Sequence, residues 1–362
     1  MVHDAPGTRR EPVPTPPFLR SPADAIASIP HLLGFVPWNS AVVLLADGRG
    51  DLALSCRIVL PDPGDLESWA REFADVLARA AGRGRIGPAQ PPRAATAESR
   101  DALIVAWAPI RRERDVRTAI PALTGALDER GIRVLDQLWT WGQRWRSLTC
   151  RDTSCCPPGG RRVGSAARTR ARSAFLGREV AASREDLEAT LRPRDPEAAA
   201  EVVRLLAGMP PVEEETRDIA ISQAHDVLAG AGGGGHPAAG PAAAQVAMAL
   251  AALRDTRVRD TLIWDLLRAP RGDWSDMRCA LEHIVRCAPP GDVAAAATVL
   301  GILHWQRGDG TRASIALRRA RDDDPTYSLA ALVDASVAAG LPPGEWLAGL
   351  RGLTREACRR AG

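Results

Sequence analysis

The first half of the chain alternates short apolar runs with longer amphipathic stretches. Residues 41–46 form a continuous apolar run and residues 52–60 form a second one, with a glycine-rich turn between them. This pattern predicts a β-hairpin whose first strand is buried on both faces. Ser21 followed by Pro22 predicts the start of a short helix that ends near Pro30.

Helices and strands continue to alternate up to about residue 148. The periodicity predicts helices at 66–81 and 112–130 and strands at 103–107, at 132–138 and in a last segment ending at Leu148. The order β-β-α-β-α-β-β is typical of an α/β or α+β domain with a mixed sheet and flanking helices. This region of the sequence contains neither a GxGxxG nor a GxxxxGKS/T phosphate loop.

The second half has helical periodicity almost throughout. Helices are expected at about residues 184–191, 196–208, 213–229, 242–254, 256–268, 275–287, 292–307, 310–322, 326–339 and 343–358. If Pro325 ends a tetratricopeptide unit, small and apolar residues fall on the matching offsets at Leu300, Gly301, Gly308, Ala313 and Ala320. An isolated unit cannot bury its own faces, so an ordinary helical hairpin is the alternative interpretation.

These patterns divide the chain into two domains. A proline- and glycine-rich segment followed by a cluster of arginines marks the boundary. The predicted organisation is a disordered leader at 1–20, an α/β domain at 21–156, a linker at 157–174 and a helical domain at 175–360 with a glycine-rich break at 230–240.

Composition and charge limit the possible surroundings and partners. Apolar residues make up 45% and charged residues 25% of the chain, as in globular proteins. No run of eighteen apolar residues occurs, which predicts a soluble, cytoplasmic protein that does not bind membranes. All 47 basic residues are arginine, but the net charge is only +3, so a nucleic-acid partner is not expected. The odd number of cysteines, seven, favours reduced thiols over a disulfide framework.

Several segments resemble the domain of unknown function 4192 family of high-GC bacteria. They include IPHLLGFVP at 29–37, and Cys150 with the Cys-Cys-Pro-Pro segment at 155–158. The stretch from Trp305 to Pro325 extends the resemblance through most of the chain. One departure is Val59, which stands two residues after the strand arginine, where the family often has an acid. The resemblance implies the two-domain architecture and no particular activity.

Cys150, Cys155 and Cys156 lie within seven residues, just after the last predicted strand. Three thiolates could supply most of a tetrahedral zinc shell, with His31 or Asp152 as a fourth ligand. A redox pair and locally packed structural thiols are the alternatives. The proline pair that follows favours an extended segment in which adjacent cysteines point apart. We therefore expect no zinc and no other cofactor, with Cys150 packed against the loop that holds the other two.

Arg57, Ser40 and Trp145 are the candidate ligand-binding residues of the α/β domain. A strand arginine could hold a carboxylate or phosphate through two parallel hydrogen bonds, while Ser40 adds a hydroxyl and Trp145 a stacking surface. The alternatives are an edge arginine paired with an acid, a serine that satisfies turn backbone, and a tryptophan packed on the sheet.

The sequence shows no nucleophile–base pair and no GxSxG elbow. Together with the tetratricopeptide-like pattern, this predicts a non-enzymatic intracellular binding or adaptor protein whose C-terminal helices hold a protein partner. The alternative is an enzyme or sensor of a small phosphorylated or nucleotide-like ligand that uses the α/β domain.

Overall fold

The computed structural model describes residues 21–46, 52–62, 64–83, 100–164, 179–230, 240–269 and 274–360. The chain divides into two compact units. The sheet unit contains residues 1–29, 38–75 and 91–171, and the helical unit contains residues 30–37, 76–90 and 172–362. The predicted leader at 1–20, and most of the predicted linker and glycine-rich break, lie outside the described residues.

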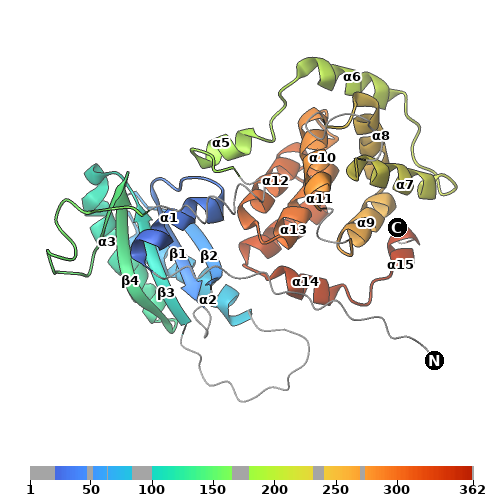
Figure 1. Ribbon diagram of the computed structural model, residues 1–362. Helices are drawn as coiled ribbons and strands as arrows, with labels where there is room; N and C mark the ends of the chain where they lie inside the picture. The colour runs from blue at the N-terminus through green and yellow to red at the C-terminus, as the bar shows by residue number, and fades with distance from the viewer. Residues whose placement is uncertain are drawn as a thin grey trace, which may run out of the picture. The chain divides into compact units, whose positions relative to one another are not determined.

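The sheet unit is built on a six-stranded sheet in the order β2-β1-β3-β4-β5-β6, shown in Figure 1. The strands are β1 Ser40–Ala46, β2 Leu52–Val59, β3 Arg100–Trp107, β4 Ile132–Trp141, β5 Arg144–Ser147 and β6 Arg161–Arg162. β3 and β4 run parallel and the other neighbours antiparallel, so the predicted mixed sheet is confirmed. Strand β6 was not predicted, and it lies inside the segment expected to be a linker.

Strand β1 forms the centre of this unit. All seven of its residues are buried, as the apolar run predicts, because β2 and β3 pair with its two edges while α1 and α3 lie on opposite faces of the sheet (Figure 1). Helix α3 Glu113–Asp128 and a 3₁₀ turn, η1 Ile110–Arg112, belong to this unit, whereas α1 Pro22–Leu33 and α2 Leu66–Arg83 begin in it and end in residues assigned to the helical unit. The Arg130 Nε donates to the Asp75 carboxylate over 2.7 Å and ties the end of α3 to α2.

The prediction that the first helix ends near Pro30 is wrong. Helix α1 continues to Leu33, with Pro30 inside it. The helix stops at Gly34, whose φ of 79° is left-handed and whose N–H donates to the Pro30 carbonyl oxygen over 2.8 Å. A glycine in this conformation is a common end of a helix, and here it outweighs the proline as a stop signal.

The helical unit contains short helices. They are α5 Arg184–Ala189, α6 Pro196–Ala207, α7 Arg217–Leu228, α8 Ala243–Arg254, α9 Thr256–Leu266, α10 Trp274–Cys287, α11 Val293–Gln306, α12 Gly310–Asp323, α13 Ser328–Ala338, α14 Pro343–Gly349 and α15 Arg355–Arg360. The single helix predicted at 343–358 is wrong, because α14 ends at Gly349 and α15 starts after Thr354, whose hydroxyl accepts from the Ala357 N–H over 3.0 Å.

Helix α11 is the core of the helical unit. It is buried at every position except Ala295 and has apolar residues on all sides, as expected of a helix surrounded by others. Helix α12 packs against it where Gly301 faces Leu317, since a Cβ at Gly301 would lie 2.8 Å from the Leu317 Cγ. No helix in the described part of the chain is long and apolar enough to cross a membrane.

Candidate functional site

Ser40 and Arg57 lie side by side on neighbouring strands of the sheet unit. Ser40 begins β1 and is fully buried, and the Arg57 Nε donates to its hydroxyl oxygen over 2.8 Å. The same hydroxyl donates to the Trp38 carbonyl oxygen over 3.0 Å. Asn39, between them, has a left-handed φ of 51°, which asparagine tolerates. The Ser40 hydroxyl therefore secures the turn before β1 and orients the arginine.

Trp145 lies three strands away from this pair. The register aligns Ser40 with Trp107, Trp107 with Thr140, and Thr140 with Trp145. At about 4.8 Å per strand, the Cα atoms of Ser40 and Trp145 are about 14 Å apart. The Trp145 ring is buried, and its N–H donates to a carbonyl oxygen of β6 over 3.2 Å. The structure thus brings Ser40 and Arg57 together and places Trp145 outside their contact.

Cys150, Cys155 and Cys156 converge just beyond β5. Their three sulfur atoms all lie within 4.8 Å of one another. A tight turn brings them together, because the Cys156 N–H donates to the Asp152 carbonyl oxygen over 2.7 Å. The expectation that the adjacent thiols point apart is therefore wrong. The proline pair begins only after this turn is complete, so it does not extend the segment that carries the cysteines.

The turn is held by short polar contacts. The Asp152 carboxylate accepts from the Ser154 N–H over 2.8 Å and from the Ser154 hydroxyl over 2.7 Å. These bonds lower the pKa of Asp152, the hydroxyl contributing most. Cys155 is exposed, Cys150 is half-buried and Cys156 is buried. Burial raises the pKa of the Cys156 thiol, and contacts with the other two thiols raise it further.

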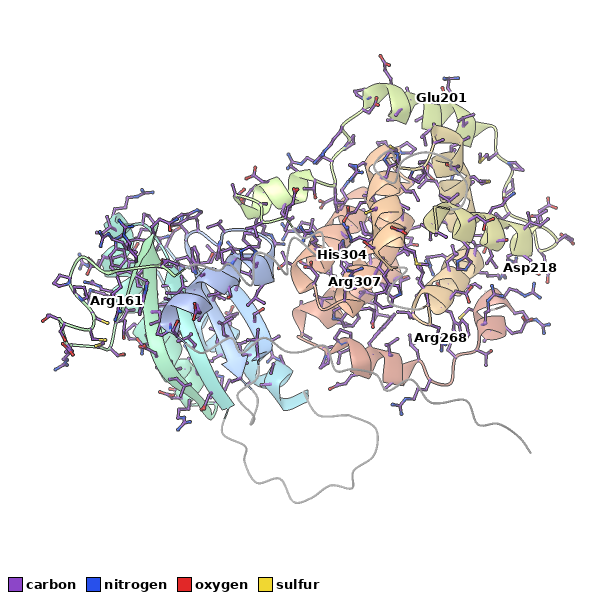
Figure 2. All side chains as sticks on the ribbon, in the orientation of Figure 1. Arg161, Glu201, Asp218, Arg268, His304 and Arg307 are labelled. Atoms are coloured by element: carbon purple, nitrogen blue, oxygen red, sulfur yellow. The ribbon has the colours of Figure 1, made fainter. Side chains whose placement is uncertain are left out.

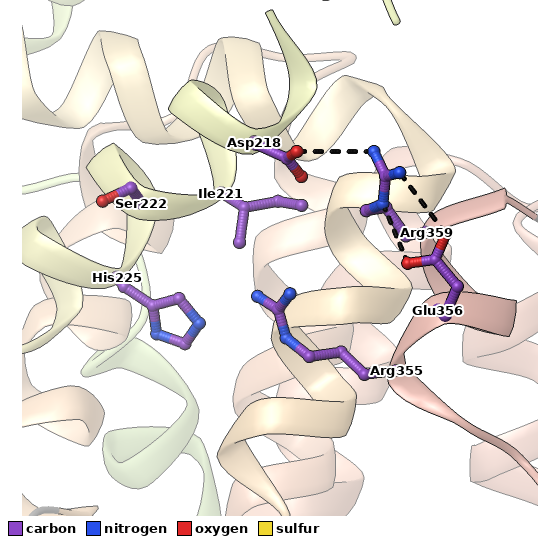
Figure 3. A pocket seen from close by; sticks show the side chains of 7 residues that line it. All are labelled: Asp218, Ile221, Ser222, His225, Arg355, Glu356 and Arg359. Atoms are coloured by element: carbon purple, nitrogen blue, oxygen red, sulfur yellow. Dashed lines mark hydrogen bonds and ion pairs between the residues drawn. The ribbon is translucent and has the colours of Figure 1, made fainter.

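A pocket of about 470 Å³ lies between α7 and α15 in the helical unit (Figure 3). It is lined by Asp218, Ile221, Ser222, His225, Arg355, Glu356 and Arg359. Ile221 is the one apolar side chain among these, whereas pockets for small molecules are mostly lined by apolar groups. The lining therefore suits a charged or strongly polar group.

Two ion-pair clusters set the charge of this pocket. Asp265, behind it, accepts from Arg355 over 2.9 and 3.0 Å and contacts the His225 Nε2 over 2.9 Å. Arg359 lies between Asp218, at 3.4 Å, and Glu356, at 3.2 Å, as the dashed lines in Figure 3 show. The hydrogen bond from Arg359 lowers the pKa of Glu356. The arginines are thus fixed in direction by acids that also balance their charge.

The sequence matches the family model described as Domain of unknown function (DUF4192) over residues 22–344. The chain belongs to the DUF4192 family. The resemblance seen in the sequence is thereby confirmed. No match was found among curated proteins or among solved structures. The DUF4192 match includes the three cysteines and the Ser40–Arg57 pair, but it ends before α15, which supplies one wall of the charged pocket.

Within the DUF4192 match, α10 carries a thiol–imidazole pair that the sequence analysis missed. The Cys287 Sγ lies 3.6 Å from the His283 Nε2. The two residues are four positions apart on one helix, a spacing that places side chains next to each other and could have predicted this contact. Burial raises the pKa of Cys287 and lowers the pKa of His283. Both shifts disfavour the thiolate–imidazolium form that an activated cysteine nucleophile requires.

Proposed function

We propose that this DUF4192 protein is a non-enzymatic intracellular binding or adaptor protein that holds a partner protein through its C-terminal helices. The observation that carries the proposal is the charged pocket between α7 and α15, in which two arginines and a histidine face an open space of about 470 Å³. The spacing of small residues along α11 and α12 supports a tetratricopeptide-like arrangement in the same unit, a type of helical hairpin that commonly presents partner surfaces.

The pocket chemistry favours an acidic group of the partner. Among the described residues Arg359 pairs with Asp218 and Glu356, whose side chains are 69% and 51% exposed, while its own is 22% exposed. Such exposed ion pairs contribute at most about 1 kcal/mol, so a partner carboxylate can replace them at little cost. A guanidinium binds a carboxylate through two parallel hydrogen bonds, which also fixes the orientation of the bound group.

Arg355 has a different role from Arg359 in this proposal. Arg355 is 44% exposed, against 22% for Arg359, but its carboxylate partner Asp265 is only 17% exposed and accepts from it over 2.9, 3.1 and 3.0 Å, so this ion pair is the better formed of the two. Arg355 therefore keeps its position and shapes the pocket, while Arg359 exchanges partners. Ser222 and His225 add hydrogen-bonding groups on the opposite wall, on α7.

The test is affinity capture from native lysate with the full chain and two charge-reversal variants. Arg359→Glu places an acid in the pocket, and we expect it to reduce recovery of the genuine partner at least about tenfold, or about 1.4 kcal/mol. Arg204→Glu is the matched control, because Arg204 is an exposed arginine on α6 that also pairs with an acid three residues away, Glu201. A protein lost with Arg359→Glu and retained with Arg204→Glu supports the proposal. Identical captured sets for all three chains would overturn it.

The alternative function is an enzyme or sensor that binds a small phosphorylated or nucleotide-like ligand in the sheet unit, and it has a separate test. The Ser40 hydroxyl is already bonded to Arg57 and to the Trp38 carbonyl oxygen, and Trp145 lies apart from both, so the three candidate residues do not share one contact. A thermal-shift screen of nucleotides and sugar phosphates tests this function directly. Stabilisation by one compound that disappears in Arg57→Ala would favour the alternative over the adaptor.

A further inference from the structure

We propose that Cys150, Cys155 and Cys156 form a binding site for one zinc ion in the sheet unit. Three sulfur donors from two separate points of one loop lie within 4.8 Å of one another. Zn–S bonds of about 2.3 Å in a tetrahedral shell place sulfurs about 3.8 Å apart, so metal binding requires a closure of no more than about 1 Å. Thiolates are also the ligands that zinc and other soft cations select over oxygen donors.

The loop that carries the three cysteines is held in shape by hydrogen bonds that leave the sulfur atoms available to a metal. The Ser147 hydroxyl accepts from the Cys150 N–H over 3.1 Å and donates to the Asp136 carboxylate over 2.7 Å. On the other side, the bond between Cys156 and Asp152 closes the turn. Cys150 and Cys156 are thus anchored independently. Because the loop is already ordered before the metal binds, less conformational entropy is lost on binding, as in metal sites whose ligands are held by supporting hydrogen bonds.

Arginines hold the far side of the same loop. The Arg144 Nη1 donates to the carbonyl oxygens of Gly159, at 3.1 Å, and Gly160, at 3.0 Å, while the Arg161 Nη1 contacts the Cys155 carbonyl oxygen at 3.4 Å. Figure 2 shows Arg161 at this edge of the sheet. Three thiolates around a divalent zinc ion carry a net charge of −1. The positive charges of Arg144 and Arg161, which are hydrogen-bonded to the backbone of the loop, stabilise that negative charge.

Zinc binds cysteines as thiolates, so each ligand thiol loses its proton on binding and the affinity of such a site for zinc rises with pH.

The three thiols leave one position of a tetrahedral shell open. Among the described residues no further histidine, cysteine or acid joins the cluster, and the Asp152 carboxylate is engaged by Ser154. The fourth ligand is therefore water or a donor from outside the loop. Three protein ligands with an exchangeable fourth position are typical of zinc sites that bind or activate an added ligand.

The experiment measures zinc in the full chain purified under reducing conditions from medium that contains zinc. We expect about one zinc per chain by elemental analysis, and a Kd below about 10 nM for added Zn²⁺ in chelator competition. Cys150→Ser and Cys156→Ser should each lower the zinc content at least tenfold. Cys279→Ser is the matched control, since Cys279 is an exposed cysteine outside the cluster.

Zinc contents below about 0.1 per chain in the wild type, with no binding of added Zn²⁺ to the reduced protein, would overturn the proposal. A disulfide between two of the three cysteines that persists under the reducing conditions would overturn it too. Equal zinc loss in Cys279→Ser would show that the metal is bound elsewhere. Circular dichroism of each variant separates loss of zinc from loss of fold. None of these outcomes depends on partner capture, so this site and the adaptor function fail separately.

Discussion

The central strand of the sheet unit is buried at every residue, and the central helix of the helical unit is buried at every residue except Ala295, but the two carry different polar groups. In β1 the one polar side chain is Ser40, and its hydroxyl is bonded to Arg57 and to the preceding turn. In α11 the buried polar side chains are Thr298, His304 and Gln306. One of these, His304, is a titratable group inside the core.

The difference follows from how each element satisfies its backbone. A strand depends on neighbouring strands for its hydrogen bonds, whereas a helix satisfies its own and can be surrounded by side chains of any kind. The helical core therefore accommodates His304, which lies in its interior (Figure 2), provided that the imidazole stays neutral. Burial lowers the pKa of His304 to about 4. Acid sensitivity is consequently built into α11 and not into β1.

The largest predicted effect is a selective loss of helical-unit stability in acid. The folded-state pKa of His304, about 4, is below the unfolded value of about 6.5. Between these values the unfolded chain binds a proton that the folded chain excludes, so stability falls as pH falls from 6.5 to 4. The slope is about 1.4 kcal/mol per pH unit, or about 2 kcal/mol lost by pH 5. The test is pulsed hydrogen exchange at pH 8 and at pH 5, which gives separate urea unfolding midpoints for peptides from α11 and from β1. The α11 midpoint should be lower at pH 5, and the β1 midpoint should not.

His304→Gln is the control for this acid effect. The neighbouring charges Asp309 and Glu282 raise the pKa of His304, and Arg312 and Arg278 lower it, but burial dominates. Removing the imidazole should therefore remove most of the pH slope of the α11 midpoint. The part due to His283, whose pKa burial also lowers, should remain. An unchanged slope in the variant would contradict the assignment.

Local patterns in the sequence predicted the elements of both cores. The apolar run of β1 and the amphipathic spacing of α2 identified a strand and a helix whose positions the structure confirms. Errors arose where one stop signal competed with another, as at Pro30 against Gly34. Strand β6 has only two residues, both exposed arginines, so no apolar pattern could reveal it.

The candidate sites were less predictable because they depend on contacts that the spacing of residues does not encode. The Ser40–Arg57 pair follows from a hairpin register, which the turn length alone leaves open. The thiol cluster depends on a backbone bond from Cys156 to Asp152, against the extended preference expected near prolines. In the charged pocket, Arg359 contacts Asp218 across 141 residues of sequence, a distance over which periodicity carries no information.

A smaller effect is predicted at the contact between α11 and α12. Gly301→Ala introduces a Cβ that would lie 2.8 Å from the Leu317 Cγ and 3.0 Å from its Cδ2. Overpacking of this kind costs about 1–3 kcal/mol, which exceeds the gain in helix propensity. The α11 urea midpoint should fall while the β1 midpoint stays unchanged. Leu317→Ala removes the clash but leaves a cavity of its own, so the double variant should lose less stability than the sum of the two single losses. An α11 midpoint that does not move in Gly301→Ala would contradict the close packing.

The smallest predicted effect comes from a second glycine-to-alanine substitution, in the sheet unit, which should raise stability instead of lowering it. Gly125 lies inside α3, and a Cβ at this position would meet nothing within 4 Å. Alanine there restricts the unfolded chain and fits the helix, so Gly125→Ala should stabilise α3 by about 0.5–1 kcal/mol. The urea midpoint of α3 peptides should rise, and that of α11 peptides should not. Because the chemical change equals that at Gly301, the opposite signs isolate local packing as the cause. A fall at Gly125 would show that α3 is as crowded as α11.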